Sequence, residues 1–357
     1  MTRPILLTGL AAFALHQLLQ AAVVWLHAGA PYLFCQYDCN WYAGILAEGY
    51  MTAPDGDAGG SQPDQNVANW AFFPLFPLLA RGLAALFGLA PPVAVILASK
   101  LLWLGAIWAF LIFQRRYLPA APLWLGAAVL VLNPAAIYAN AGYTEPLFLL
   151  LACLALAAMR AERPLTAGLL GALLTATRAA GLGLGLAFAL HALGRVIRDP
   201  AADGGRLILA GLLIPLGFGG YMLFLYLHTG DAMAFSHIQR AWDRSLTNPL
   251  THLMQGLAAP GYPRLMALSA LGGLGLSVYL ALRGEAGLAL FLAFATLLPL
   301  ATGTSSMGRY VAMQPGFLLA LVMLMHRYRW MRLLLLPGAA GYLAMSHAWQ
   351  EGAFYVI

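Results

Sequence analysis

Charged residues are scarce in this chain of 357 residues. They make up 9% of it, whereas hydrophobic residues make up 62% and the mean hydropathy is +0.78. A soluble domain carries roughly 25% charged residues. The composition therefore excludes an ordinary soluble globule and predicts an all-α polytopic membrane protein, which we expect to form a single integral membrane domain over residues 1–357.

Lysine is almost absent as well. Lys100 is the only one, against 18 arginines scattered over short segments between apolar runs. Nucleic-acid-binding proteins instead gather basic residues on one face. We read the arginine bias as the composition of a GC-rich bacterial genome, and no nucleic-acid partner is expected.

The chain has only three cysteines, which excludes a disulfide scaffold. Cys35 and Cys39 flank Asp38, and a local disulfide or two packed thiols both remain open. No histidine or cysteine cluster has zinc-ligand spacing, so no cofactor is expected. A divalent cation held by Asp38 and Glu145 is a less favoured alternative.

Apolar runs long enough to cross a bilayer need about 20 residues. Arg3 precedes a long run without a cleavage site for a signal peptidase, so we expect a retained first helix. The sequence predicts about eleven spans, near residues 5–27, 92–113, 120–138, 145–159, 165–178, 181–195, 207–228, 265–282, 286–302, 310–326 and 333–349.

The basic residues orient these spans. With the N-terminus inside, 12 of the 19 basic residues fall in cytoplasmic segments. This predicts a bacterial inner-membrane protein with two long periplasmic loops, 28–91 and 229–263. Residues 71–89 are apolar, but counting them as a crossing would invert every later loop. We expect a re-entrant or interfacial helix there, and a true span beside a broken neighbour is the alternative.

Unusual polar motifs fall on the predicted periplasmic side from distant parts of the chain. They are Asp38 with Trp41 and Tyr42; residues 140–146 with Tyr143 and Glu145; Thr177-Arg178; His237, Gln239, Arg240 and Trp242; and residues 302–310 with Arg309. Such convergence is typical of an active site at one membrane surface.

Each motif also has a structural interpretation. Asp38, for which no cationic partner is predicted, could be a solvated loop acid or a helix N-cap. Glu145 could be stabilised by the positive end of a helix dipole. Arg178 lies in an apolar region, where a guanidinium needs an anion; we favour a bound phosphate over pairing with Glu145 or Asp38. Arg309 could snorkel to the interface or bind phosphate.

Two further features also have two interpretations each. Lys100 lies inside a predicted span, where it could face a polar cavity or reach the outer interface. The run Phe72-Phe73-Pro74 with Phe76 could anchor the chain at the interface or line a groove for an isoprenoid tail.

These motifs resemble the PIG-V type mannosyltransferases (the GPI mannosyltransferase 2 family) of the GT-C membrane glycosyltransferases. The matching blocks are Asp38-x-x-Trp41-Tyr42, Glu48-Gly49-Tyr50, residues 71–77 (Ala-Phe-Phe-Pro-Leu-Phe-Pro), residues 133–145 and Gly230-Asp231 through Trp242. Tyr37 and Cys39 depart from the family pattern. The resemblance implies a GT-C fold, transfer of a sugar, usually mannose, from a polyprenyl-phosphate donor, and Asp38 as the catalytic base.

We therefore expect an inverting glycosyltransferase in which Asp38 deprotonates an acceptor hydroxyl. The acceptor would be a glycan, a lipid or a protein. Donor phosphate is expected at Arg178, Arg309 and Lys100. The substrate is expected to contact Trp41, Tyr42, Tyr143, Glu145, His237, Gln239 and Trp242, with Phe72, Phe73 and Phe76 along the lipid. The alternative is a transporter or flippase, although transporters place polar residues near the bilayer midplane.

Overall fold

The computed structural model describes residues 2–26, 35–55, 66–199 and 203–353. The regular structure of these parts is helical, and their one β-type pairing is an isolated bridge between Asp55 and Val67. The prediction of an all-α protein is confirmed.

Within the described residues, five helical segments are long and apolar enough to cross a membrane. They are α1 (Arg3–Leu26), α4 (Pro91–Tyr117), η4 with α8 (Ala179–Arg198), α9 with α10 (Gly204–Thr229) and α13 (Tyr262–Leu282). Shorter apolar helices accompany them, namely α7 (Pro164–Thr175), α14 (Ala286–Leu300) and α16 (Pro315–Arg327). With α6 (Glu145–Arg160) and α17 (Leu335–Gln350) they form a multi-pass membrane protein.

Some of the predicted spans are not single helices. Residues 120–138 contain α5 (Leu123–Val131) and the 3-10 helix η3 (Pro134–Ala139), because Asn133 caps a new turn that begins at Pro134. Residues 310–326 contain the end of α15 (Met307–Ala312) and then α16, which begins at Pro315. A proline is well tolerated in the first turn of a helix but not inside one. The count of eleven spans stays a prediction.

Residues 71–89 form the short helix α3 (Leu75–Phe87). Thirteen residues of α-helix extend about 20 Å, less than the roughly 30 Å of a bilayer core. One face, with Phe76 and Ala80, is buried, whereas Leu78 and Leu86 are exposed. The exposed leucines fit contact with lipid in either arrangement, and the interfacial position of α3 stays a prediction.

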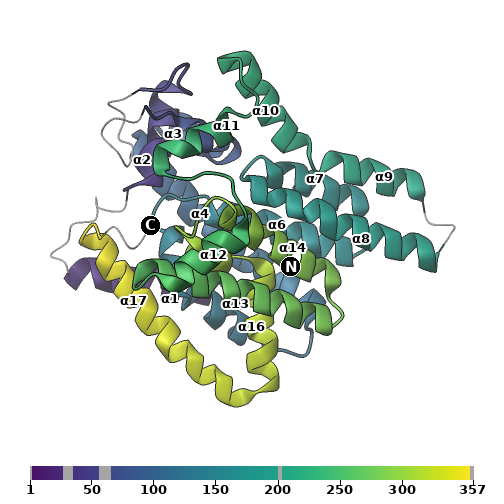
Figure 1. Ribbon diagram of the computed structural model, residues 1–357. Coiled ribbons are helices and arrows are strands. Elements are labelled where there is room, and N and C mark those ends of the chain that lie inside the picture. Colours follow the sequence, from purple (N-terminus) through teal and green to yellow (C-terminus); the bar gives the residue numbers. More distant parts are fainter. Residues whose placement is uncertain (1, 27–34, 56–65, 200–202, 354–357) are drawn as a thin grey trace.

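Helix α7 lies tightly against both α9 and α10. A Cβ atom on Gly168 would lie 2.5 Å from the Ala210 carbonyl oxygen, and one on Gly217 would lie 1.9 Å from that of Ala172. Small residues commonly permit such close helix approach in membranes. Figure 1 shows α7, α8 and α9 at one side of the molecule, apart from α2 (Asp38–Glu48), α3 and α11 (Ala234–His237).

Long-range hydrogen bonds join the segments between helices. Asn133 donates from Nδ2 to the Ala312 carbonyl at 2.7 Å, and the Thr247 N–H donates to the Ala301 carbonyl at 2.8 Å. Leu75, at the start of α3, donates to the Ala176 carbonyl at 3.1 Å. Each bond joins two segments that are far apart in the sequence.

Candidate active site

Asp38 is the first residue of α2, and its carboxylate forms an ion pair. Arg309 Nη1 donates to Asp38 Oδ2 at 2.8 Å, and the Asp38 N–H donates to the Tyr143 hydroxyl at 3.4 Å. The expectation that Asp38 has no cationic partner is wrong, because its partner lies 271 positions away. It is not an N-cap either, since Tyr37 holds that position. The Asp38 side chain remains 21% exposed and can be reached by a substrate.

The segment before Asp38 is fixed on both sides. Cys35 and Cys39 form a disulfide, which decides between the two alternatives left open by the sequence. The Tyr37 hydroxyl donates to the Gly352 carbonyl at 2.9 Å, and Gln36 Nε2 donates to the Trp349 carbonyl at 3.0 Å. The start of α2 is therefore held by a covalent bond and by the C-terminal end of α17.

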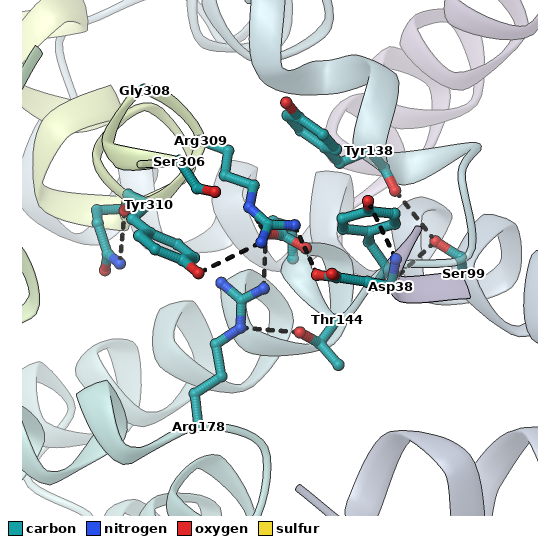
Figure 2. A network of polar contacts seen from close by, with 12 residues as sticks. Asp38, Ser99, Tyr138, Thr144, Arg178, Ser306, Gly308, Arg309 and Tyr310 are labelled. Carbon is teal, nitrogen blue, oxygen red and sulfur yellow. Dashed lines mark hydrogen bonds and ion pairs between the residues drawn. The ribbon is translucent and has the colours of Figure 1, made fainter. Parts of the chain in front are cut away.

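Two arginines and two carboxylates form a continuous chain of ion pairs (Figure 2). Arg178 Nη2 lies 2.6 Å from Glu145 Oε1, and Arg309 Nε lies 3.7 Å from the same oxygen. Arg178 Nε also donates to the Thr144 hydroxyl at 2.8 Å. The alternative of an Arg178–Glu145 pair is thus what the structure contains. Glu145 begins α6, where the positive end of the helix dipole also stabilises a carboxylate.

This chain of ion pairs has unused hydrogen-bonding capacity. Glu145 and Arg309 are 1% and 4% exposed, yet Glu145 Oε2 and Arg309 Nε have no hydrogen-bond partner among the described residues. Buried polar atoms are paired in the great majority of cases, and exceptions occur where a ligand or water binds. Both atoms are therefore candidates for contact with a substrate.

Tyr310 and Arg244 complete the cluster, and the sequence did not single out Arg244. The Tyr310 hydroxyl accepts from Arg309 Nη2 and from Arg244 Nη1, both at 3.3 Å. Arg178 Cζ lies 5.3 Å from the centre of the Tyr310 ring. Burial raises the pKa of a phenol, but the surrounding guanidiniums outweigh it and lower the pKa of Tyr310 to about 7. The cluster thus contains three arginines and two carboxylates, which leaves it positively charged while the Tyr310 hydroxyl is protonated.

Backbone strain is concentrated beside this cluster. Four non-glycine residues of the described chain have positive φ, and three of them adjoin the site: Tyr37 at 52°, Asp243 at 54° and Ser306 at 64°. Tyr37 precedes Asp38, Asp243 precedes Arg244, and Ser306 accepts a hydrogen bond from Arg244. Such strain persists where surrounding contacts fix a functional geometry.

An aromatic cluster borders Asp38 on the side of Trp41. The Trp41 ring stacks on Phe72 with centroids 5.6 Å apart and meets Trp242 edge-on at 5.7 Å. Tyr42 meets Phe72 and Phe76 edge-on. Trp242 therefore brings the second long loop to the first one.

The three phenylalanines expected along the lipid are all buried in this packing, Phe73 against Tyr221. An open apolar groove of about 410 Å³ lies between α2, α3 and α10, and other residues line it, among them Pro77, Leu78, Leu216, Gly220 and Phe224. A role in lipid binding for Phe72, Phe73 and Phe76 stays a prediction.

Lys100, expected at the donor phosphate, and His237, expected at the substrate, make other contacts. Lys100 Nζ donates to Gln17 Oε1 at 3.1 Å, between α4 and α1. His237 is exposed and lies 2.6 Å from Asp231 Oδ2. Gln239 is half-buried in η5 (Ile238–Trp242). Among the described residues, the side chains of His237 and Gln239 form no hydrogen bond or ion pair with Asp38 or Arg309.

Over the described ranges, no group of three or more histidine, cysteine, aspartate or glutamate side chains could hold a metal ion. Asp38 and Glu145 each face an arginine rather than each other. Asp57, the second acid of the only Asp-x-Asp in the first long loop, lies outside the described residues. Metal independence stays an expectation.

No protein-family model and no curated protein matches the chain. Among solved structures, the apo oligosaccharyltransferase of Archaeoglobus fulgidus aligns with a TM-score of 0.52 at 11% identity, over 98% of this chain and 56% of that one. The same archaeal enzyme in complex with an inhibitory peptide and a dolichol-phosphate aligns with a TM-score of 0.48 at 11% identity, over 96% and 55%.

The chain thus spans about half the length of the archaeal enzyme. At this identity the likeness shows the fold and not the activity. The chain has a GT-C type membrane fold.

Proposed function

We propose that the protein is an inverting membrane glycosyltransferase that moves a sugar from a polyprenyl-phosphate donor to an acceptor hydroxyl. The observation that carries this proposal is the contact between Asp38, a reachable carboxylate, and a cluster of three arginines. The first supplies a base and the second an anion site. The sequence motifs favour mannose as the sugar.

The arginine cluster fits the donor phosphate. Arg244 and Arg309 donate to the Tyr310 hydroxyl, and Arg178 lies over the Tyr310 ring. Planar guanidiniums bind phosphate oxygens through paired hydrogen bonds. Their excess charge over Asp38 and Glu145 would stabilise the phosphate as it leaves. Glu145 Oε2, buried and unpaired, is suited to accept a hydrogen bond from a hydroxyl of the donor sugar.

The reaction then needs one proton acceptor. The acceptor oxygen attacks the anomeric carbon while its proton passes to the Asp38 carboxylate. The bond between the anomeric carbon and the phosphate oxygen breaks, and its electron pair stays on the phosphate. A single in-line displacement inverts the anomeric configuration. Arg309, which contacts Asp38, would hold the base and the leaving phosphate in fixed positions relative to each other.

The fold agrees with this chemistry, since its structural neighbour is an oligosaccharyltransferase. That argument is an analogy of fold. The arginine distribution in the sequence supports a bacterial inner membrane, with Asp38 facing the periplasm.

One observation favours the alternative of a transporter or flippase. Polar residues lie within the apolar helices α1 and α4, where Lys100 donates to Gln17 and Gln17 donates to Asn140 Oδ1 at 3.0 Å. Transporters place such groups near the midplane.

A test that separates the two functions uses the purified protein in phospholipid vesicles with mannosyl polyprenyl phosphate as the donor. The glycosyltransferase releases polyprenyl phosphate when membrane extract is added as a source of acceptor. Movement of intact donor between leaflets, with no polyprenyl phosphate released, would support the transporter.

A further inference from the structure

A second cavity, of about 670 Å³, lies beside Asp38 and has no role in the mechanism above. It is formed by the outward face of α2 and by the turn that follows it; its walls include Tyr37, Asn40, Trp41, Gly44, Glu48 and Thr52. Its wall therefore combines aromatic rings with polar side chains, as small-molecule sites do.

The turn that forms one wall is held in place by side chains. Asn69 donates from Nδ2 to the Gly49 carbonyl and accepts from the Met51 N–H at Oδ1, both at 3.0 Å. Trp70 Nε1 donates to the Met51 carbonyl at 2.6 Å, and the Tyr50 hydroxyl donates to the Phe72 carbonyl at 2.7 Å. The wall exists before a ligand arrives, which lowers the entropic cost of binding.

Other polar groups of the wall are available to a ligand. Within the part of the chain that the structure describes, the side chains of Asn40, Glu48 and Thr52 form no hydrogen bond or ion pair. An amide, a carboxylate and a hydroxyl together both donate and accept hydrogen bonds. A ligand rich in hydroxyl groups meets both requirements.

The cavity lies next to the catalytic carboxylate. Successive residues of an α-helix are about 100° apart around its axis, so Trp41, Gly44 and Glu48 of α2 share one face. Asp38 lies at the border between this face and the buried face of α2, and Trp41 lies between Asp38 and the centre of the cavity face. The Asp38 carboxylate itself points to Arg309. The base therefore separates the cavity from the arginines.

We propose that this cavity binds the acceptor and that the acceptor is a carbohydrate, either a free glycan or the head group of a glycolipid. The inference rests on the proposed function, because in-line displacement requires the acceptor and the leaving phosphate on opposite sides of the donor sugar. A bound sugar hydroxyl would reach Asp38 past the edge of Trp41.

A peptide acceptor fits this cavity less well. Extended peptides commonly bind by adding a strand to an exposed sheet edge or by filling apolar pockets. Outside the undescribed segments, the only strand-like pairing is the Asp55–Val67 bridge. The cavity is lined by polar side chains, among them Asn40, Glu48 and Thr52, rather than by apolar ones alone.

The test fills the cavity with a bulky side chain placed on α2. A Cβ atom on Gly44 meets nothing within 4 Å, so Gly44→Phe places a ring in the cavity without a clash at the helix. Gly82→Phe, on the exposed side of α3, is the matched control because its Cβ also meets open space. Glu48→Gln is a milder second variant that leaves the volume unchanged.

Each variant is added to membranes of a source strain that lacks the gene, with radiolabelled mannosyl polyprenyl phosphate as the probe. We expect Gly44→Phe to lower transfer to labelled product at least tenfold, and Glu48→Gln to raise the amount of membrane needed for half-maximal rate. Label in the aqueous fraction indicates a free glycan, and label in the membrane fraction indicates a glycolipid. The donor should raise the melting temperature of both variants as much as that of wild type and Gly82→Phe. The labelled product should resist proteases and be cleaved by glycosidases.

Several results would overturn the inference: full transfer by Gly44→Phe, loss of the donor-induced stabilisation together with transfer, or labelled peptides after protease treatment. By contrast, if the donor neither stabilises the wild-type protein nor labels any product, the proposed function itself is wrong.

Discussion

Arg309 Nη1 lies 2.8 Å from Asp38 Oδ2, across 271 positions of sequence. Arg309 is 4% exposed and Asp38 21%, so the pair lies at the boundary between core and solvent. The arginine also contacts the Tyr310 hydroxyl and lies near Glu145. One guanidinium therefore connects the proposed base to the proposed phosphate site, and both can be tested through it.

The first prediction concerns the base. Asp38→Asn keeps an acceptor for Arg309 but cannot take a proton, so transfer should fall by at least ~10²-fold. Because a charged hydrogen bond is weakened, the free energy of unfolding should also fall by about 1 kcal/mol. Glu162→Gln removes the acid of an exposed pair with Arg195 and is the control for loss of a charge. An Asp38→Asn enzyme within tenfold of wild type would exclude Asp38 as the base.

The second prediction separates phosphate binding by Arg178 from its pairing with Glu145. Arg178→Ala leaves the buried Glu145 carboxylate with only Arg309 nearby, which should cost about 2–3 kcal/mol of stability. Adding Glu145→Gln removes that unpaired charge and should restore most of the melting temperature. The donor Michaelis constant should stay high in the double variant, because the phosphate ligand is still missing. If the donor Michaelis constant and the melting temperature both return to wild-type values in the double variant, Arg178 has a structural role and does not bind the phosphate.

The third prediction concerns orientation in the membrane. Leu246 is exposed and lies in the predicted periplasmic loop 229–263, so a cysteine there should react with an impermeant maleimide from the periplasm. A cysteine at Arg116 should react only after the membrane is permeabilised. The background is low because Cys153 is buried and Cys35 and Cys39 are bonded to each other. Labelling of both positions from the same side would contradict the predicted topology.

Composition and charge were sufficient to predict the all-α architecture. The long helices α1, α4 and α13 lie where apolar runs predicted them. In lipid, an apolar segment must pair its backbone N–H and C=O groups internally, and an α-helix does so. Hydropathy predicted one continuous span over residues 120–138, where the structure has two helices. A proline divides an apolar run without making it less apolar. Asp38, Glu145 and Arg309 were placed on one side of the membrane from loop order alone.

The pairings within the site could not be predicted from the sequence. Asp38 with Arg309 and Arg178 with Glu145 join distant segments, and nothing in the local sequence specifies the partner of a charge. Arg244 was missed because it lies in an irregular loop outside the recognised motifs. Its place in the cluster becomes visible only through its hydrogen bond to the Tyr310 hydroxyl.

The fourth prediction concerns the disulfide before α2. It closes a loop of five residues that contains Asp38, and such a loop contributes about 2 kcal/mol through the unfolded state. Cys35→Ser with Cys39→Ala should lower the melting temperature and slow transfer, since Asp38 is held less firmly. A reductant should affect wild type in the same way and leave the double variant unchanged. Equal transfer rates in both proteins would show that the disulfide does not position the base.

The last prediction uses the acidic phenol of Tyr310. Its pKa of about 7 means that the hydroxyl ionises near neutral pH, and a phenolate would compete with donor phosphate for the same arginines. Donor binding should therefore weaken as pH rises, by about tenfold for each pH unit above 7 if the two anions exclude each other. The donor is a phosphodiester with no second ionisation near neutral pH, so the effect belongs to the protein.

By the same linkage, bound donor should raise the pKa of Tyr310, because a second negative charge disfavours the phenolate. The measurements are the donor dissociation constant and the phenolate absorbance as functions of pH. Tyr310→Phe should bind donor with little dependence on pH, whereas Tyr226→Phe, which removes an exposed tyrosine on α10, should behave as wild type. A pH dependence that persists in Tyr310→Phe would place the titrating group elsewhere and leave the arginines without evidence of a shared anion site.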